Sequence, residues 1–190
     1  MSSILSSLSK TIISGFILLL LIIFLISTSS EFYFDYAFSS FIFRWLHVLS
    51  GVMWIGLLWY FNFVQIPSMP NIPDEHKPAI SKVIAPKALF WFRWAALSTL
   101  ITGIVLGHLN GYLYDALTLD SYNGKNLMIG IGMWLGIIMA FNVWVIIWPN
   151  QKKALGIVQV SAEEKAISAK RAMLFSRTNT LLSIPMLYCM

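Results

Sequence analysis

An arginine and a histidine lie three residues apart in one of the most apolar stretches of this chain, FRWLHVLSGVMWIG. In a helix, residues three, four and seven positions apart lie on one face. The face that contains His47 also holds Arg44, Gly51, Trp54, Leu58, Asn62 and Gln65. Because lipid cannot satisfy polar side chains, those of a membrane helix point into the protein. The spacing therefore predicts a polar stripe that faces the inside of a helical bundle.

A second histidine, His108, lies near the end of the apolar run that follows. Consecutive runs cross a membrane in opposite directions, so His108 is expected at a depth similar to that of His47, which lies about 10 Å inside its helix. Two imidazoles on neighbouring helices can bind the iron of a haem b from opposite sides. Arg44 can then pair with a haem propionate, and Trp54 can flank the ring. The sequence thus predicts a haem or metal site with His47 and His108 as ligands.

Each of these residues also has a simpler structural interpretation. An intramembrane histidine can form a hydrogen bond to a neighbouring helix, and His108 can lie at the interface in contact with water. Arg44 can extend to the lipid headgroups, as Arg93 is expected to do at the opposite face of the membrane. His76 lies in the charged stretch PDEHKP and is expected to be solvated.

The composition indicates which elements must position these residues. Of the 190 residues, 58% are hydrophobic and 11% are charged, whereas soluble domains carry about 25% charged residues. Several apolar runs reach the roughly 20 residues that a membrane-spanning helix needs. The sequence predicts an all-α, integral membrane helical bundle with about five transmembrane helices in a single domain, 1–190. The runs are expected at about 11–27, 37–65, 88–109, 127–148 and 174–190.

Two features refine the expected helix boundaries. The first run is interpreted as a retained anchor, because its apolar core is longer than the about 7–15 residues of a signal peptide. Pro67 and Pro70 are expected to end the second run, and Pro149 the fourth. Ser161 and Glu164 fit a capping box, which predicts a helix that begins there.

The lysines and arginines indicate the orientation in the membrane. They are concentrated at the N-terminus and in the second and fourth loops, whereas the first loop carries Glu31 and Asp35 and the third only Lys125. By the positive-inside rule, the N-terminus and the second and fourth loops are cytoplasmic. This distribution explains the net charge of +5 without a nucleic-acid partner, and the lipid bilayer is the expected surrounding.

Several classes of chemistry have no support in the sequence. It contains no glycine-rich phosphate loop and no GxSxG, HExxH or CxxC motif. The single cysteine, Cys189, excludes an internal disulfide and the CxxCH attachment site of a c-type haem.

Three stretches resemble the N-terminal membrane domain of bacterial membrane-bound urate oxidases (urate hydroxylases). They follow one another in the same order as in that family and read RWLHVLSGVMWIGLLWYFNFVQIPSMP, FNVWVIIWPNQKKALG and SRTNTLLSIPMLY. The resemblance implies a redox function in the bacterial inner membrane, with electrons passing to a cytochrome c. Members of the family carry a cytochrome c domain after the membrane part. Because this sequence has no CxxCH, the resemblance here implies a separate cytochrome c or a different substrate.

The favoured interpretation is therefore a membrane redox protein that binds haem b through His47 and His108, with Arg44 and Trp54 beside the haem. Whether the chain is itself an enzyme is left open. Two alternatives remain: a non-enzymatic membrane subunit of a homo- or hetero-oligomer, and a small-molecule transporter in which Asn62, Gln65 and Asn142 form a polar path.

Overall fold

The computed structural model describes residues 2–29 and 33–190, and over these residues the protein is all-α. Glu31, which entered the prediction of orientation, lies outside the described residues. The chain forms two compact units, Met1–Ser39 and Ser40–Met190. The first unit contains α1 (Ser2–Leu5) and α2 (Leu8–Ser29). Because α2 is apolar around its whole circumference, it has the character of a lipid-exposed helix.

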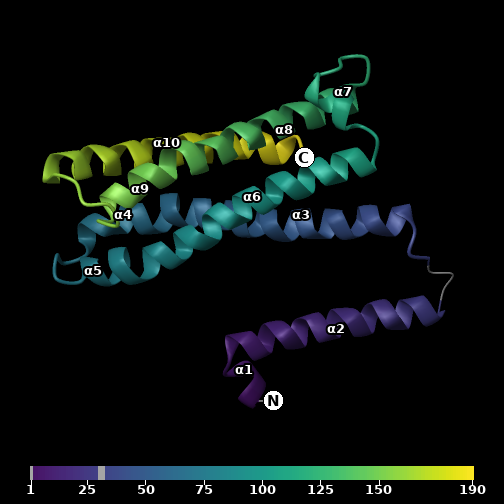
Figure 1. Ribbon diagram of the computed structural model, residues 1–190, viewed down its shortest axis with the longest axis horizontal. Coiled ribbons are helices and arrows are strands. Elements are labelled where there is room, and N and C mark those ends of the chain that lie inside the picture. Colours follow the sequence, from purple (N-terminus) through teal and green to yellow (C-terminus); the bar gives the residue numbers. More distant parts are fainter. Residues whose placement is uncertain (1, 30–32) are drawn as a thin grey trace. The chain divides into compact units, whose positions relative to one another are not determined.

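The second unit is a bundle of long helices that run side by side and alternate in direction (Figure 1). One end carries α7 and the other carries α4, α5 and α9 (Figure 1), and we name them the α7 end and the α9 end. The helices of this unit are α3 (Tyr36–Trp59), of which the first four residues belong to the first unit, η1 (Tyr60–Gln65), α4 (Ile66–Ser68), η2 (Met69–Asn71), α5 (Lys77–Ala79), η3 (Ile80–Ile84), α6 (Ala85–Leu109), α7 (Leu113–Leu117), α8 (Gly124–Phe141), η4 (Asn142–Ile147), α9 (Trp148–Ala154) and α10 (Ala162–Tyr188).

Four helical stretches within the described residues are long and apolar enough to cross a membrane, one fewer than the predicted five. They are Leu8–Thr28, Tyr36–Asn71, Lys77–Leu109 and Gly124–Ala154. The fifth predicted run, 174–190, forms the second half of α10. The first half of α10 carries Lys165, Lys170 and Arg171, and the second half carries Arg177 and Asn179, so neither half is as apolar as the four candidate spans.

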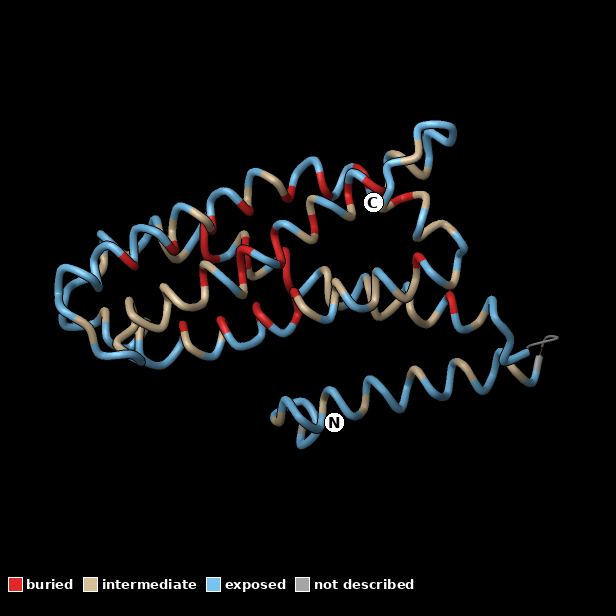
Figure 2. Tube along the Cα trace, turned by 45° about the horizontal axis from the view of Figure 1, so that its top comes forward, coloured by how far each residue is buried: buried red, intermediate tan, exposed pale blue. Residues whose placement is uncertain are grey.

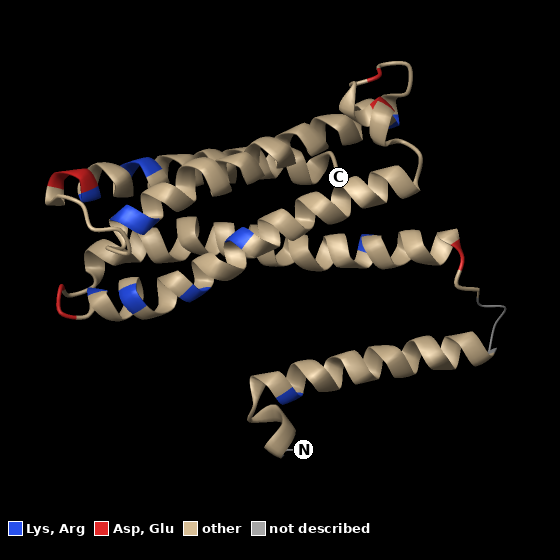
Figure 3. Ribbon diagram, viewed as in Figure 1, with Lys and Arg blue, Asp and Glu red and all other residues tan. Residues whose placement is uncertain are grey.

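The two lysine-bearing connections of the bundle lie at the same end, in agreement with their predicted location on one side. Lys77 belongs to α5, while Lys152 and Lys153 belong to α9 (Figure 1). In Figure 3 most of the Lys and Arg positions of the bundle lie towards this end, together with some acidic residues. Asp115 in α7 belongs to the opposite end.

The expectation that Pro67 and Pro149 end their helices was wrong, whereas the helical stretch that contains Pro67 does end at Asn71, next to Pro70. The helix continues without a break past both Pro67 and Pro149, and it does so past Pro86 as well. Each stands at the second residue after a π-helical segment, which ends at Gln65, Ile84 or Ile147, respectively. A proline ring collides with the carbonyl four residues before it in an α-helix. The wider π turn moves that carbonyl away and lets the helix continue. The predicted cap of α10 is confirmed, since the Glu164 N–H donates to Ser161 Oγ at 3.2 Å.

The packed core includes large side chains from α3, α6 and α8–η4, and Figure 2 shows where the buried residues gather. Its largest fully buried side chains include Trp54, Phe92, Leu58, Met139 and Ile147. Trp54 and Leu58 belong to the face of α3 that was predicted to point inward, which confirms that part of the prediction.

Buried amides fasten the second half of α10 to the other helices. Asn62 Nδ2 donates to Ser176 Oγ at 2.8 Å. Asn142 Nδ2 donates to Asn179 Oδ1 at 2.9 Å, and Asn179 Nδ2 donates to the Met139 carbonyl at 2.9 Å. Interhelical hydrogen bonds of this kind hold membrane helices together where no hydrophobic force acts between them.

Arg93 does not extend to the membrane surface as expected. Only 8% of it is exposed, and its guanidinium carbon lies 3.3 Å from the ring centroid of Trp148. The face of the indole ring attracts the cation electrostatically, so Arg93 contributes to the packing between α6 and α9.

Candidate functional site

The imidazole of His47 is held in one orientation by α6. Its Nδ1 lies 3.0 Å from the Thr99 carbonyl oxygen and 3.2 Å from Thr102 Oγ1. A carbonyl oxygen can only accept, and the Thr102 hydroxyl donates its own hydrogen to the backbone carbonyl of Ser98 or Thr99. Nδ1 is therefore the nitrogen that carries the hydrogen. In the neutral ring this leaves Nε2 with a free lone pair, as in histidines that bind metals.

A glycine of α6 makes this close approach of the ring feasible. A Cβ atom built on Gly103 would lie 2.9 Å from His47 Cε1 and 3.2 Å from Nδ1. Any side chain at position 103 would displace the imidazole from its hydrogen bonds to α6. Gly103 was noticeable in the sequence only as part of a GxxxG pattern, which is typical of helix packing.

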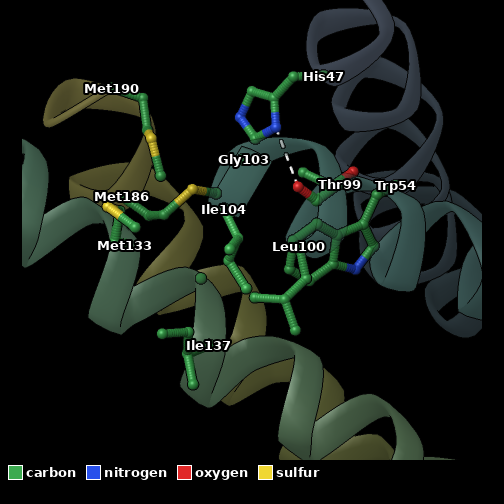
Figure 4. A pocket seen from close by; sticks show the side chains of 11 residues that line it. His47, Trp54, Thr99, Leu100, Gly103, Ile104, Met133, Ile137, Met186 and Met190 are labelled. Carbon is green, nitrogen blue, oxygen red and sulfur yellow. Dashed lines mark hydrogen bonds between the residues drawn. The ribbon is translucent and has the colours of Figure 1, made fainter. Parts of the chain in front are cut away.

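Three cavities meet at His47 and Met190, which line all of them. A small cavity of about 50 Å³ lies between α3, α6, α8 and α10 (Figure 4). A second, of about 400 Å³, is walled by apolar residues such as Val52, Ile55 and Leu187. A third, of about 540 Å³, reaches towards the α7 end. A flat ligand beside the imidazole thus has space on both sides of the line from His47 to Met190.

The cavity of about 540 Å³ has a cationic rim. Arg44, Lys125, Asn110 and Tyr112 all line it. Burial raises the pKa of the Tyr112 phenol, and the positive charge of Arg44 opposes this effect. Tyr112 therefore stays protonated at neutral pH and can donate a hydrogen bond. Two cations and a phenol at one edge suit the carboxylates of an anionic ligand.

The side of the small cavity opposite His47 is lined by methionines. The side chains of Met133, Met186 and Met190 come together there from α8 and from the C-terminal part of the chain, facing the imidazole across the cavity (Figure 4). Sequence reasoning missed them because methionines in an apolar helix are typical of ordinary core packing. Met186 lies in the last turn of α10, whereas Met190 follows the end of that helix, so no helical pattern in the sequence brings the two together.

The structure brings together three of the four predicted site residues. Trp54 lines the two cavities of about 50 and 400 Å³, and Arg44 lines the one of about 540 Å³, both together with His47. His108 is exposed and is not among the residues that line these three cavities. Over the described residues, no group of three or more His, Cys, Asp or Glu side chains comes together to hold a metal ion.

A separate cavity of about 270 Å³ lies nearer the α9 end. Gln65, Gln151 and Ser176 line it together with apolar side chains. The side-chain carbonyl oxygens of Gln65 and Gln151 are enclosed and accept no hydrogen bond from the described residues. This cavity can therefore receive a molecule that donates hydrogen bonds.

A family model matches residues 113–190, from α7 to the last residue. It describes the urate oxidase N-terminal domain. The resemblance to the urate oxidase N-terminal family predicted from the sequence is thereby confirmed for this part of the chain. The match includes Lys125 and the three methionines of the cavities, whereas His47 and Gly103 lie before its first residue. Neither the curated proteins nor the solved structures gave a match.

Proposed function

We propose that this protein is a membrane redox module that binds haem b between α3, α6, α8 and α10, and that it passes electrons to a separate cytochrome c. The observation that carries the proposal is the oriented His47, whose Nε2 is left free beside cavities of about 400 and 540 Å³. The chemistry that haem would supply is reversible one-electron transfer.

The residues present fit this group. His47 would donate its Nε2 lone pair to the iron, and its Nδ1–H bond to the Thr99 carbonyl would keep the ring in place. Arg44 and Lys125 would pair with the propionates, and Tyr112 would donate a hydrogen bond to one of them. The wall of the cavity of about 400 Å³ would receive the apolar edge of the macrocycle. Gly103 supplies the space that the imidazole occupies.

The proposed orientation places the haem near the outer face of the bacterial inner membrane. The lysine-bearing α5 and α9 lie at the opposite end from α7, and the positive-inside rule assigns the lysine-rich side to the cytoplasm. Arg44 and Lys125 line the cavity that reaches towards the α7 end. A separate cytochrome c outside the membrane would reach this edge. The N-terminus would be cytoplasmic and α2 an anchor in the lipid.

The absorption spectrum of the full chain tests haem binding directly. The protein is produced with haem supplied during expression and purified in detergent. We expect a Soret band that is absent in His47→Ala and retained in His76→Ala, because His76 is exposed in a loop. A purified protein without a Soret band would contradict the proposal. Reduction of added cytochrome c by membranes supplied with urate then tests the substrate suggested by the family resemblance.

A second candidate function is the binding of a small polar molecule at the cavity of about 270 Å³, as the transporter or subunit interpretation requires. It is favoured by the unpaired carbonyl oxygens of Gln65 and Gln151. Uptake of labelled urate into proteoliposomes would test it. Uptake that falls in Gln65→Leu and Gln151→Leu but not in His47→Ala would favour this function over electron transfer.

A further inference from the structure

We propose that the thioether of Met190 is the second axial ligand of the haem, opposite His47. This inference rests on the proposed haem binding and names the residue that completes the site. It replaces the pairing of two histidines that the sequence alone suggested.

The position of Met190 relative to the cavities is the first argument. Met190 and His47 together line all three cavities that meet at this point. A flat macrocycle bound between their side chains would extend into the space of about 400 Å³ on one side and about 540 Å³ on the other. In Figure 4 the side chain of Met190 points into the small cavity on the side that faces His47.

The backbone beside Met190 is anchored to α8, which is the second argument. Cys189 ends α10 through its N–H, which donates to the carbonyls of Pro185 and Met186. Its side chain packs on Gly132, where an added Cβ atom would lie 3.0 Å from Cys189 Cβ. The small residue at position 132 thus lets the end of α10 approach α8. This contact sets the place from which the Met190 side chain starts.

The other two methionines are less suited to the same role. Met186 is 5% exposed and belongs to the packed core. Met133 lines the cavities of about 50 and 540 Å³ and is not among the residues that line the cavity of about 400 Å³. Met190 is 51% exposed, so its unbranched side chain has the freedom to adjust to an iron atom.

A thioether ligand has consequences that can be measured. It is neutral and soft, and histidine–methionine ligation raises the reduction potential of haem iron above that of two histidines. With both axial positions filled, the iron is six-coordinate and low-spin. The site would then suit electron transfer and not the binding of oxygen.

The test compares haem-loaded full-length variants by absorption and magnetic circular dichroism spectra and by redox titration. The wild type is expected to be low-spin, with the far-red charge-transfer band of a sulfur–iron(III) bond. Met190→Leu, which keeps the side-chain volume, should lose this band, become high-spin and show a lower midpoint potential. Met190→His should restore the low-spin state without the band, which shows that the variant folds. Met133→Leu and Met186→Leu test the two neighbouring methionines and should keep the sulfur–iron band, while Met53→Leu, at an exposed residue that is not among those lining the three cavities, is the matched control.

Several outcomes would overturn this assignment. A Met190→Leu protein that keeps the band would do so, and so would loss of the low-spin state in His108→Ala or loss of the band in Met186→Leu. If the wild type shows a Soret band together with any of these results, haem binding stands and only the assignment of Met190 as a ligand is refuted. A wild-type protein without a Soret band contradicts haem binding itself, and the assignment of Met190 with it.

Discussion

The two ends of the bundle use their polar residues in different ways. Near the α9 end, two amides bond to neighbouring helices, Asn62 to Ser176 and Asn142 to Asn179, while the carbonyl oxygens of Gln65 and Gln151 face the cavity of about 270 Å³. Nearer the α7 end, His47 forms hydrogen bonds to a neighbouring helix through Nδ1 alone, and it lines three cavities. We infer that a polar residue in an apolar helix indicates a ligand site only where packing leaves both space and a free polar atom.

The largest expected effect is on stability, and it comes from removing the buried hydrogen bonds that Asn179 forms with Asn142 and with the Met139 carbonyl. Asn179→Ala removes the partner of Asn142 and the donor to the Met139 carbonyl. Since a buried polar group left unpaired costs about 1–3 kcal/mol, we expect a loss of about 3 kcal/mol in the free energy of unfolding. Thermal or denaturant unfolding in detergent measures it. Thr178→Ala is the control, because Thr178 is exposed and bonds only within α10.

Asn179→Ala also tests whether the amide bonds of α10 and the cavities at His47 are independent of each other. Haem bound per folded Asn179→Ala protein should equal that of the wild type, because Asn179 is not among the residues that line the cavities at His47. An unchanged unfolding free energy would refute the structural role of the amide network.

Gly103→Ala should weaken haem binding about tenfold, since overpacking a close contact costs roughly 1–3 kcal/mol. The added methyl group would lie 2.9 Å from His47 Cε1 and would push the ring from α6. Haem titration followed at the Soret band gives the affinity. Gly51→Ala is the matched control, because its added Cβ atom would meet only Thr99 Cγ2 at an ordinary 3.9 Å. Equal affinities in the two variants would show that the position of His47 is irrelevant.

Neutralising the rim should have a smaller effect. Arg44→Gln and Lys125→Gln each remove a cation from the exposed edge of the cavity. Exposed ion pairs contribute about 0.2–1 kcal/mol, so each change should weaken haem binding at most about fivefold, and less at high salt. Lys152→Gln, at the α9 end, should leave the affinity unchanged. A salt-independent loss would rule out pairing with propionates.

Thr102→Val should have the smallest effect. Valine keeps the shape of threonine but removes the Oγ1 acceptor that lies 3.2 Å from His47 Nδ1. The Thr99 carbonyl at 3.0 Å still fixes the tautomer, so haem affinity should change less than about threefold, in line with about 0.5 kcal/mol for a weak second bond. A complete loss of haem would mean that Thr102 holds the ring alone.

The sequence was sufficient for the long helices, though not for where they end, and for His47, Trp54 and Arg44 of the candidate site. Hydrophobic runs and a 3.6-residue period predicted α3 and its inward face, with Trp54, Leu58 and Asn62. The depths of His47 and His108 along their helices could also be estimated from the sequence. Depth does not determine in which direction around the helix axis a side chain points. His108 follows Gly103 by five residues and is therefore turned about 140° from it, and Gly103 is the residue that faces His47.

Two other features, the continuation of helices past prolines and the position of Met190, could not be predicted from short sequence patterns. The continuation of helices past Pro67, Pro86 and Pro149 needs π turns before each proline. The lining role of Met190 depends on where α10 ends against α8, which is a tertiary property.

The most direct test of the central claim is the Soret absorbance per protein of the full chain, produced with haem supplied, in the wild type and in His47→Ala. We predict one haem per chain in the wild type and none in His47→Ala, with both proteins folded by circular dichroism. Equal haem content in the two proteins, or none in the wild type, would contradict the account.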